Sequence, residues 1–141
     1  MTTTTDLIPL FVYGTLRRGH GLHDHIRYAA LPNDPVHYPA LIEGELRYHD
    51  CMYYPVLTPG DRAVVGDFYM LPDCRALMDV LTMEHRAGYT VTNREVLIQL
   101  HNGETVFRNA LVCLWERPAH FLPLVPGQDW DLASPPDGWV N

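Results

Sequence analysis

The stretch FVYGTLRRGHG, residues 11–21, decides how this chain is interpreted, because an apolar run ends there in a glycine-rich loop. Residues 7–13, LIPLFVY, predict a short buried strand. Glycine allows a close backbone approach, and successive N–H groups in such a loop can bind a carboxylate or phosphate. The loop is therefore either a plain turn or an anion-binding loop, in which Gly14 would allow the close approach and Thr15 would add a hydroxyl donor. At most one of Arg17 and Arg18 would also face a ligand, since neighbouring side chains diverge.

The composition is typical of one globular domain. The 141 residues fit a single hydrophobic core, and contents of 47% apolar and 19% charged residues argue against a disordered chain. The net charge of −7 argues against a nucleic-acid or anionic-membrane partner. No apolar run is long enough to span a membrane, and the start MTTTTDLIPLF does not resemble a secretory signal, so we expect a cytoplasmic protein.

Residue types that are missing or rare exclude several common reactions. All ten basic residues are arginine, which excludes Schiff-base catalysis and the lysine of phosphate-binding P-loops. Ser134 is the only serine and lies in no nucleophile-elbow motif. Cys51, Cys74 and Cys113 form no CxxC pair, which argues against a disulfide framework and a structural zinc site. We expect each cysteine to be a small buried apolar residue.

The remaining segments predict an α+β fold in a single domain, 1–141. Further strands are expected at 40–49, 62–71, 89–100 and 105–115, with a turn near 58–61, a possible bulge at Gly66 and a hairpin turn at Asn102-Gly103. Helices are expected at 22–30 and from Pro72-Asp73 through Glu84, where Asp73 would cap the first turn. These elements suit a mostly antiparallel sheet or a small barrel, with the proline-rich tail 117–141 wrapped over its surface.

Glu84 is the candidate catalytic carboxylate. Leu77, Leu81 and Glu84 are spaced i, i+4, i+7, which places Glu84 on the apolar face of the second predicted helix. Burial and the negative end of the helix dipole both raise the pKa of a carboxyl group there, which suits acid–base catalysis near neutral pH. The alternative is a helix that ends early and leaves Glu84 in solvent.

Histidines and tyrosines give weaker indications. The cluster of His20, His23 and His25 matches no metal-ligand motif, so we expect no metal site, and a metal-binding protein remains the weakest hypothesis. Tyr54 and Tyr89 are candidates to line a polar pocket inside a barrel; the alternative is ordinary packing with a hydrogen-bonded hydroxyl.

Taken together and in order, these motifs resemble a known family. FVYGTLRRG, followed roughly seventy residues later by LMDVLTMEHRAGY with Asp79 and Glu84, is similar to the γ-glutamylcyclotransferase-like superfamily, also called AIG2-like. EGELRYHDCMYYPVL and VVGDFYML resemble intermediate segments of that family, so the resemblance covers about residues 8–115. It implies a small mixed, mostly antiparallel β-barrel with flanking helices.

The resemblance also implies an activity. Enzymes of this superfamily release 5-oxoproline from γ-glutamyl compounds, because the free α-amine attacks the γ-carbonyl of the same residue and expels an amine. No cofactor is required. By the resemblance, Glu84 would be the general acid/base, and the loop from Tyr13 to Leu16 would bind the substrate. The expected partner is a small γ-glutamyl amine or peptide.

Two departures from the family pattern leave the substrate open. Val91 stands where members carry an arginine after the tyrosine, with Arg94 three residues later, and Cys113 stands where a tyrosine is common. The alternative function is a non-catalytic small-molecule-binding module on the same fold, although a binder gains little from a buried carboxylate. The sequence fixes neither the leaving amine nor the oligomeric state.

Overall fold

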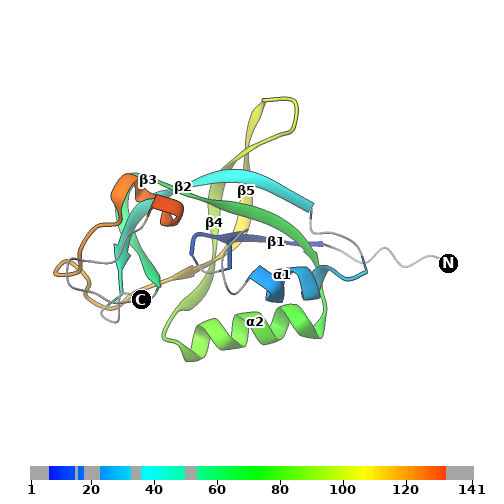
Figure 1. Cartoon of the computed structure of the whole chain (residues 1–141), viewed down its shortest axis with the longest axis horizontal. Coiled ribbons are helices and arrows are strands. Elements are labelled where there is room, and N and C mark those ends of the chain that lie inside the picture. The colour runs from blue at the N-terminus through cyan, green and yellow to red at the C-terminus, as the bar shows by residue number, and fades with distance from the viewer. Residues whose placement is uncertain (1–6, 15, 18–22, 33–35, 50–53, 133–141) are drawn as a thin grey trace.

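Five strands form a closed barrel in the computed structural model, which describes residues 7–14, 16–17, 23–32, 36–49 and 54–132 (Figure 1). Their order around the barrel is β1-β3-β2-β4-β5. The strands are β1 (Leu7–Val12), β2 (Val36–Tyr48), β3 (Pro55–Pro72), β4 (Thr90–Gln99) and β5 (Thr105–Leu114). The helices are α1 (His23–Ala30) and α2 (Arg75–Arg86), followed by the 3₁₀ turns η1 (Pro126–Gln128) and η2 (Trp130–Leu132).

The pairing of the strands is antiparallel except where the barrel closes. There β1 meets β5 in parallel, with Leu10 opposite Leu111. Helices α1 and α2 lie together on one side of the barrel, and the β4–β5 hairpin projects on the other side (Figure 1). The predicted fold class, a mixed and mostly antiparallel barrel with flanking helices, is confirmed.

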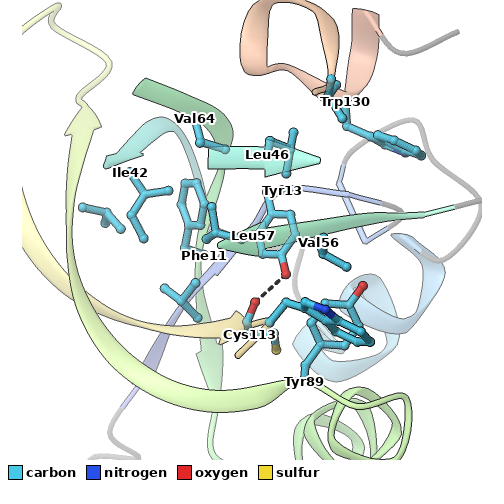
Figure 2. Packing of buried hydrophobic residues seen from close by; sticks show 14 of the residues in the cluster. Phe11, Tyr13, Ile42, Leu46, Val56, Leu57, Val64, Tyr89, Cys113 and Trp130 are labelled. Carbon is cyan, nitrogen blue, oxygen red and sulfur yellow. Dashed lines mark hydrogen bonds between the residues drawn. The ribbon is translucent and has the colours of Figure 1, made fainter. Parts of the chain in front are cut away.

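The hydrophobic core has two parts because the barrel buries side chains on both of its faces. Alternate residues of β2, including Ile42 and Leu46, point into the barrel and pack against Phe11 and Val64 (Figure 2). The outer face of β1 and β3 is covered by the helices in a second cluster built around Leu10, Ile26, Leu71, Leu77 and Val80. This second cluster fixes α2 against the barrel and so determines where Glu84 lies.

Among the described residues, no helix is long and apolar enough to cross a membrane.

The positions of the β-bulge and of the helix N-cap differ from those that the sequence predicts. The turn expected near 58–61 is a bulge inside one long strand, because Gly44 pairs with Arg62 whereas Glu45 pairs with Thr58. Gly66 is not a bulge, since it pairs in regular register with Ala40. The N-cap of α2 is Cys74 rather than Asp73, and its side chain makes no capping hydrogen bond.

Gly66 is instead required by close packing, which gives a testable prediction. A Cβ atom there would lie 2.4 Å from Phe11 Cζ and 2.4 Å from the Val12 carbonyl oxygen. We expect Gly66→Ala to lower the free energy of unfolding by about 3 kcal/mol, measured by urea denaturation. Gly103→Ala is the matched control: nothing lies within 4 Å of its Cβ position, and only its positive φ of 88° is unfavourable, at about 1 kcal/mol. Equal losses in the two variants would contradict the packing explanation.

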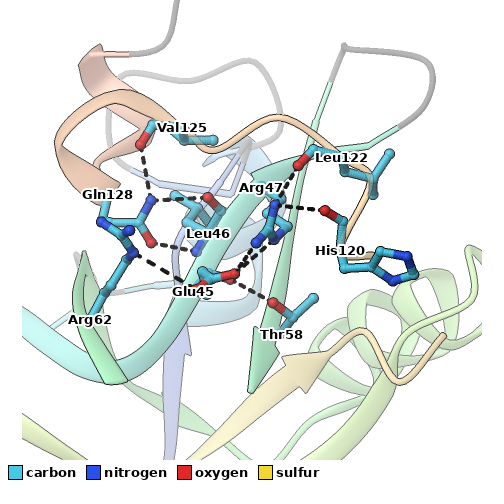
Figure 3. Close-up of polar contacts among 9 residues, drawn as sticks. All are labelled: Glu45, Leu46, Arg47, Thr58, Arg62, His120, Leu122, Val125 and Gln128. Atoms are coloured by element: carbon cyan, nitrogen blue, oxygen red, sulfur yellow. Dashed lines mark hydrogen bonds and ion pairs between the residues drawn. The ribbon is translucent and has the colours of Figure 1, made fainter. Parts of the chain in front are cut away.

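The sequence predicts that the segment after β5 wraps over the surface of the barrel. In the structure this segment also contributes side chains to the hydrophobic core. Leu122, Val125 and Trp130 are buried in the cluster that fills the barrel. The side chain of Gln128 accepts a hydrogen bond from the Leu46 N–H at 2.6 Å and donates to the Leu46 carbonyl at 3.0 Å (Figure 3). The C-terminal segment 116–132 therefore adds backbone partners and apolar side chains to the end of β2.

Candidate active site

A cavity of about 240 Å³ opens between the loop after β1, the start of β3, the end of α2 and the start of β4. Six of the residues predicted to form a site line this cavity: Tyr13, Gly14, Leu16, Tyr54, Glu84 and Tyr89. Thr15 lies outside the described residues. The structure thus brings together positions that are up to seventy-six residues apart in the sequence (Tyr13 and Tyr89).

Glu84 lies in the last turn of α2, on the side of the helix that faces the cavity. Leu77 and Val80 on the same helix are buried against the barrel, which fixes the orientation of this turn. The Glu84 carbonyl accepts hydrogen bonds from the N–H groups of Ala87 and Tyr89, each at 3.1 Å, so the chain leaving the helix is held in place. Burial raises the pKa of the Glu84 carboxyl to about 7. This carboxyl can therefore both accept and donate a proton near neutral pH.

Tyr13 and Cys113 form the wall of the cavity at which the barrel closes. The Tyr13 hydroxyl donates a hydrogen bond to the Cys113 carbonyl, which joins the end of β1 to the end of β5 (Figure 2). Burial raises the pKa of Tyr13 well above its usual value, and repulsion between the ionised forms of Tyr13 and Tyr89 adds to this rise. Burial and the nearby Glu84 raise the pKa of the Cys113 thiol to about 12. Both groups are neutral at physiological pH and make this wall apolar.

Gly14 lets the loop pack directly on the start of β3. A Cβ atom at Gly14 would lie 2.7 Å from Cγ and 2.8 Å from Cδ of Pro55. The loop then turns tightly, and the Arg17 N–H donates to the Gly14 carbonyl at 3.0 Å. The glycine is therefore needed for a close approach of the loop to Pro55. The close approach of this backbone to a ligand stays a prediction.

Arg17 faces away from the cavity and anchors the loop from behind. Its guanidinium contacts Asp67 on β3 at 3.1 Å, Asp129 at 2.6 Å and Asp131 at 3.3 Å. Asp67 is also bound by His37 at 2.8 Å. Burial opposes the charge of Asp67, but the hydrogen bond from His37 and the Arg17 charge outweigh it and hold the pKa of this carboxyl below its usual range. Arg17 is thus committed to this ion cluster, and Arg18 lies outside the described residues.

Aromatic side chains complete the cavity at the end of α2. The Tyr89 hydroxyl donates to the Pro55 carbonyl at 2.5 Å, and the Tyr54 and Tyr89 rings lie 6.3 Å apart. Trp115 packs edge-on against Tyr89 at 5.3 Å, and His49 stacks on Tyr54 at 4.3 Å. Neither Trp115 nor His49 stands in a recognisable sequence motif, so no local pattern indicates their place beside the two tyrosines.

The histidine cluster does not gather into a site within the described part of the chain. Nδ1 of His23 lies 3.1 Å from the Leu16 carbonyl, His25 is exposed, and His20 lies outside the described residues. No group of three or more metal-ligating side chains occurs among the residues that the structure describes. Cys74 and Cys113 are free cysteines. Val91, the other departure from the family pattern, pairs with Cys113 across β4 and β5.

Comparison with known proteins identifies the class to which this barrel and cavity belong. A family model described as "Gamma-glutamyl cyclotransferase, AIG2-like" matches residues 10–132. The chain belongs to this family. The match continues past the stretch 8–115 on which the sequence resemblance rested and takes in the C-terminal segment. No match was found among curated protein sequences.

The fold is similar to that of solved structures from three different organisms. An AIG2-like protein from Mus musculus is 22% identical over 84% of this chain and 86% of its own, with a TM-score of 0.67. An uncharacterised protein from Pyrococcus horikoshii is 22% identical over 88% and 90%, with a TM-score of 0.59. A uropathogenic E. coli-specific protein is 22% identical over 88% and 92%, with a TM-score of 0.60. At these identities the likeness shows a shared fold.

Proposed function

We propose that this protein is a γ-glutamyl cyclotransferase that releases 5-oxoproline from a small γ-glutamyl amine or peptide. The observation that carries the proposal is the position of Glu84, whose carboxyl lines the same cavity as the loop of Tyr13, Gly14 and Leu16. Burial gives this carboxyl a pKa of about 7, which suits a group that must take up and return a proton in one reaction cycle.

The reaction needs one proton carrier and no external nucleophile. Glu84 takes a proton from the substrate's α-ammonium, and the freed amine attacks the γ-carbonyl carbon to form the new C–N bond of the lactam. Glu84 gives this proton to the leaving nitrogen of the tetrahedral intermediate, and the bond between that nitrogen and the carbonyl carbon breaks. The ring nitrogen still carries a second proton, which passes through Glu84 to the departing amine. The products are 5-oxoproline and an ammonium ion, so atoms and charges balance.

The loop after β1 would supply orientation. In the proposal, backbone N–H groups from Tyr13 through Leu16 bind the substrate α-carboxylate and so hold the α-amine against the γ-carbonyl. Ring closure responds strongly to such positioning, because a correctly oriented intramolecular nucleophile reacts as if it were highly concentrated. The anchored Arg17 supports this role, since it keeps the loop rigid against β3 and the C-terminal segment.

The direct test is to incubate the protein with a panel of γ-glutamyl amines and dipeptides. The 5-oxoproline released is measured by chromatography and compared with a buffer blank. Release from at least one member above the blank is expected. If the purified, folded protein binds panel members without releasing 5-oxoproline, the enzyme proposal is wrong and the chain is a binding module.

The pH dependence of the activity follows from Glu84. As a general base it must be ionised in the free enzyme, so kcat/KM is expected to rise with pH through an apparent pKa of about 7. The α-amine of each substrate also titrates, and its pKa is measured separately by titration of the substrate alone. A profile that stays flat between pH 6 and roughly 8 after this correction would exclude Glu84 as the base.

A further inference from the structure

We propose that the amine released by this enzyme is small and apolar, carrying no charged group near the scissile bond. The inference rests on the proposed function and concerns the part of the cavity that the leaving group would occupy. In the proposed reaction the leaving nitrogen lies next to Glu84. Two observations then support the inference: the side chains that line the cavity around Glu84, and the partners of the neighbouring arginines.

The leaving nitrogen must lie within hydrogen-bonding distance of Glu84, because it receives its proton from that carboxyl. Its carbon atoms then lie against the residues that flank Glu84 in space. Met83 and Ala87 line the cavity from the same end of α2, and Tyr89 follows directly, with its N–H bound to the Glu84 carbonyl at 3.1 Å.

The cavity wall around this point is apolar. Met83, Ala87 and Pro55 offer aliphatic surface, and the two tyrosines beside them have their hydroxyls engaged with the protein. Tyr89 donates to the Pro55 carbonyl, and the Tyr54 hydroxyl lies 3.2 Å from Nε2 of His49. The rings are thus held by polar contacts at their tips, and their carbon faces remain to contact a ligand.

Two arginines of the described neighbouring segments have partners outside the cavity. Arg17 is bound by three aspartates, and the Arg117 guanidinium lies over the Trp115 ring at 5.3 Å. Within the described part of the chain, Glu84 is the one carboxylate that lines the cavity, and no arginine or histidine joins it. Glu84 itself is engaged with the scissile nitrogen in the proposed reaction. A carboxylate or a second ammonium on the leaving group would therefore lose its water without gaining a further charged partner among the described lining residues.

The size of the cavity sets a second limit. Its volume of about 240 Å³ is below the roughly 300–1,000 Å³ of typical small-molecule sites, and the glutamyl group must share it. The remaining space suits a short chain of a few carbon atoms.

Three substrates of matched length test the proposal: γ-glutamyl amides of butylamine, 4-aminobutanoate and 1,3-diaminopropane. They differ only in ending with a methyl, a carboxylate or an ammonium group. We expect kcat/KM for the butylamide to exceed the other two by about a hundredfold. A charged substrate turned over equally well or better overturns the inference and leaves the proposed function intact. Absence of 5-oxoproline from all three overturns the proposed function and this inference with it.

A second experiment keeps the substrate and changes the apolar wall of the cavity, by the substitution Met83→Gln. The variant keeps the length of the side chain but adds a polar amide, so kcat/KM for the butylamide is expected to fall by about five- to tenfold. The γ-glutamyl methylamide, whose leaving group is too short to reach this surface, should change less than about twofold. Met78→Gln, on the exposed face of the same helix, is the matched control. Equal losses for the two substrates would mean that Met83 acts on Glu84 or on folding, and would overturn its assigned role.

Discussion

Glu84→Gln is expected to reduce 5-oxoproline release by at least about a hundredfold, because the amide can neither take the proton from the α-ammonium nor return it to the leaving amine. The substitution keeps the shape of the side chain, so KM should change much less than kcat. The measurement is steady-state kinetics on the best substrate of the panel.

Glu95→Gln is the matched control for this variant. Glu95 is an exposed glutamate on β4, and the chemical change is identical, so its activity should equal that of the unmodified protein. Circular dichroism of both variants checks the fold. An active Glu84→Gln enzyme would rule out the assigned mechanism even though the family membership stands.

Stability gives an independent readout of the same carboxyl. Its pKa is about 7 in the folded protein and 4.5 in an unperturbed chain, so the folded state binds more protons between these values. Ionisation of Glu84 therefore lowers the free energy of unfolding of the unmodified protein as pH rises from 4.5 to 7. The glutamine of the variant does not titrate and makes no such contribution. Urea denaturation at pH 8 should find Glu84→Gln more stable by about 1–3 kcal/mol, with the difference vanishing near pH 4. A difference that does not vary with pH would contradict the burial of this group.

Arg17→Met is expected to lower the free energy of unfolding by about 3–5 kcal/mol, because it leaves Asp67 and Asp129 without their cation in a largely buried site. That loss is a large share of the total stability of a domain of this size. Urea denaturation measures it, and Asp129→Asn provides a milder variant if the methionine protein does not fold.

Two substitutions at exposed positions serve as controls for the loss of stability expected in Arg17→Met. Arg94→Met removes an exposed arginine of β4, and Asp131→Asn removes the most exposed carboxylate of the cluster, whose side chain is 49% exposed. Both should change stability by less than about 1 kcal/mol. If Arg94→Met costs as much as Arg17→Met, the buried cluster does not stabilise the loop. A folded Arg17→Met protein with unchanged KM would show that the anchor does not shape the binding loop.

The parts of the fold that rest on local patterns could be predicted from the sequence. Alternating residues in 89–100 and 105–115, with Asn102-Gly103 between them, indicated the β4–β5 hairpin, and the structure confirms it. The helical spacing of Leu77 and Glu84 placed the carboxyl on the inner face of α2, because side chains four and seven residues apart share one face. The catalytic role of Glu84 stays a prediction.

Features set by distant contacts could not be predicted. At most one of Arg17 and Arg18 is expected to face a ligand, and nothing in the sequence indicates the ion cluster of Arg17. Two of its partners stand 50 and 112 residues away and share no motif with it. Pro59-Gly60 suggested a chain reversal, yet the pairing partner β2 continues and forces a bulge. Asp73 had the chemistry of a cap, but the helix begins one residue later because packing against α1 and the barrel, not capping, positions α2.

The anchoring of Arg17 has a consequence for the newly made protein. Translation adds residues from the N-terminus at roughly 5–20 per second, so the 112 residues between Arg17 and Asp129 take roughly 6–20 seconds to synthesise. During that interval the loop after β1 has been synthesised but lacks the carboxylate of Asp129 as a partner for Arg17. For most of the interval the barrel also lacks β5, the strand that closes it. The loop therefore gains the whole of its anchor only after Asp129 has been synthesised.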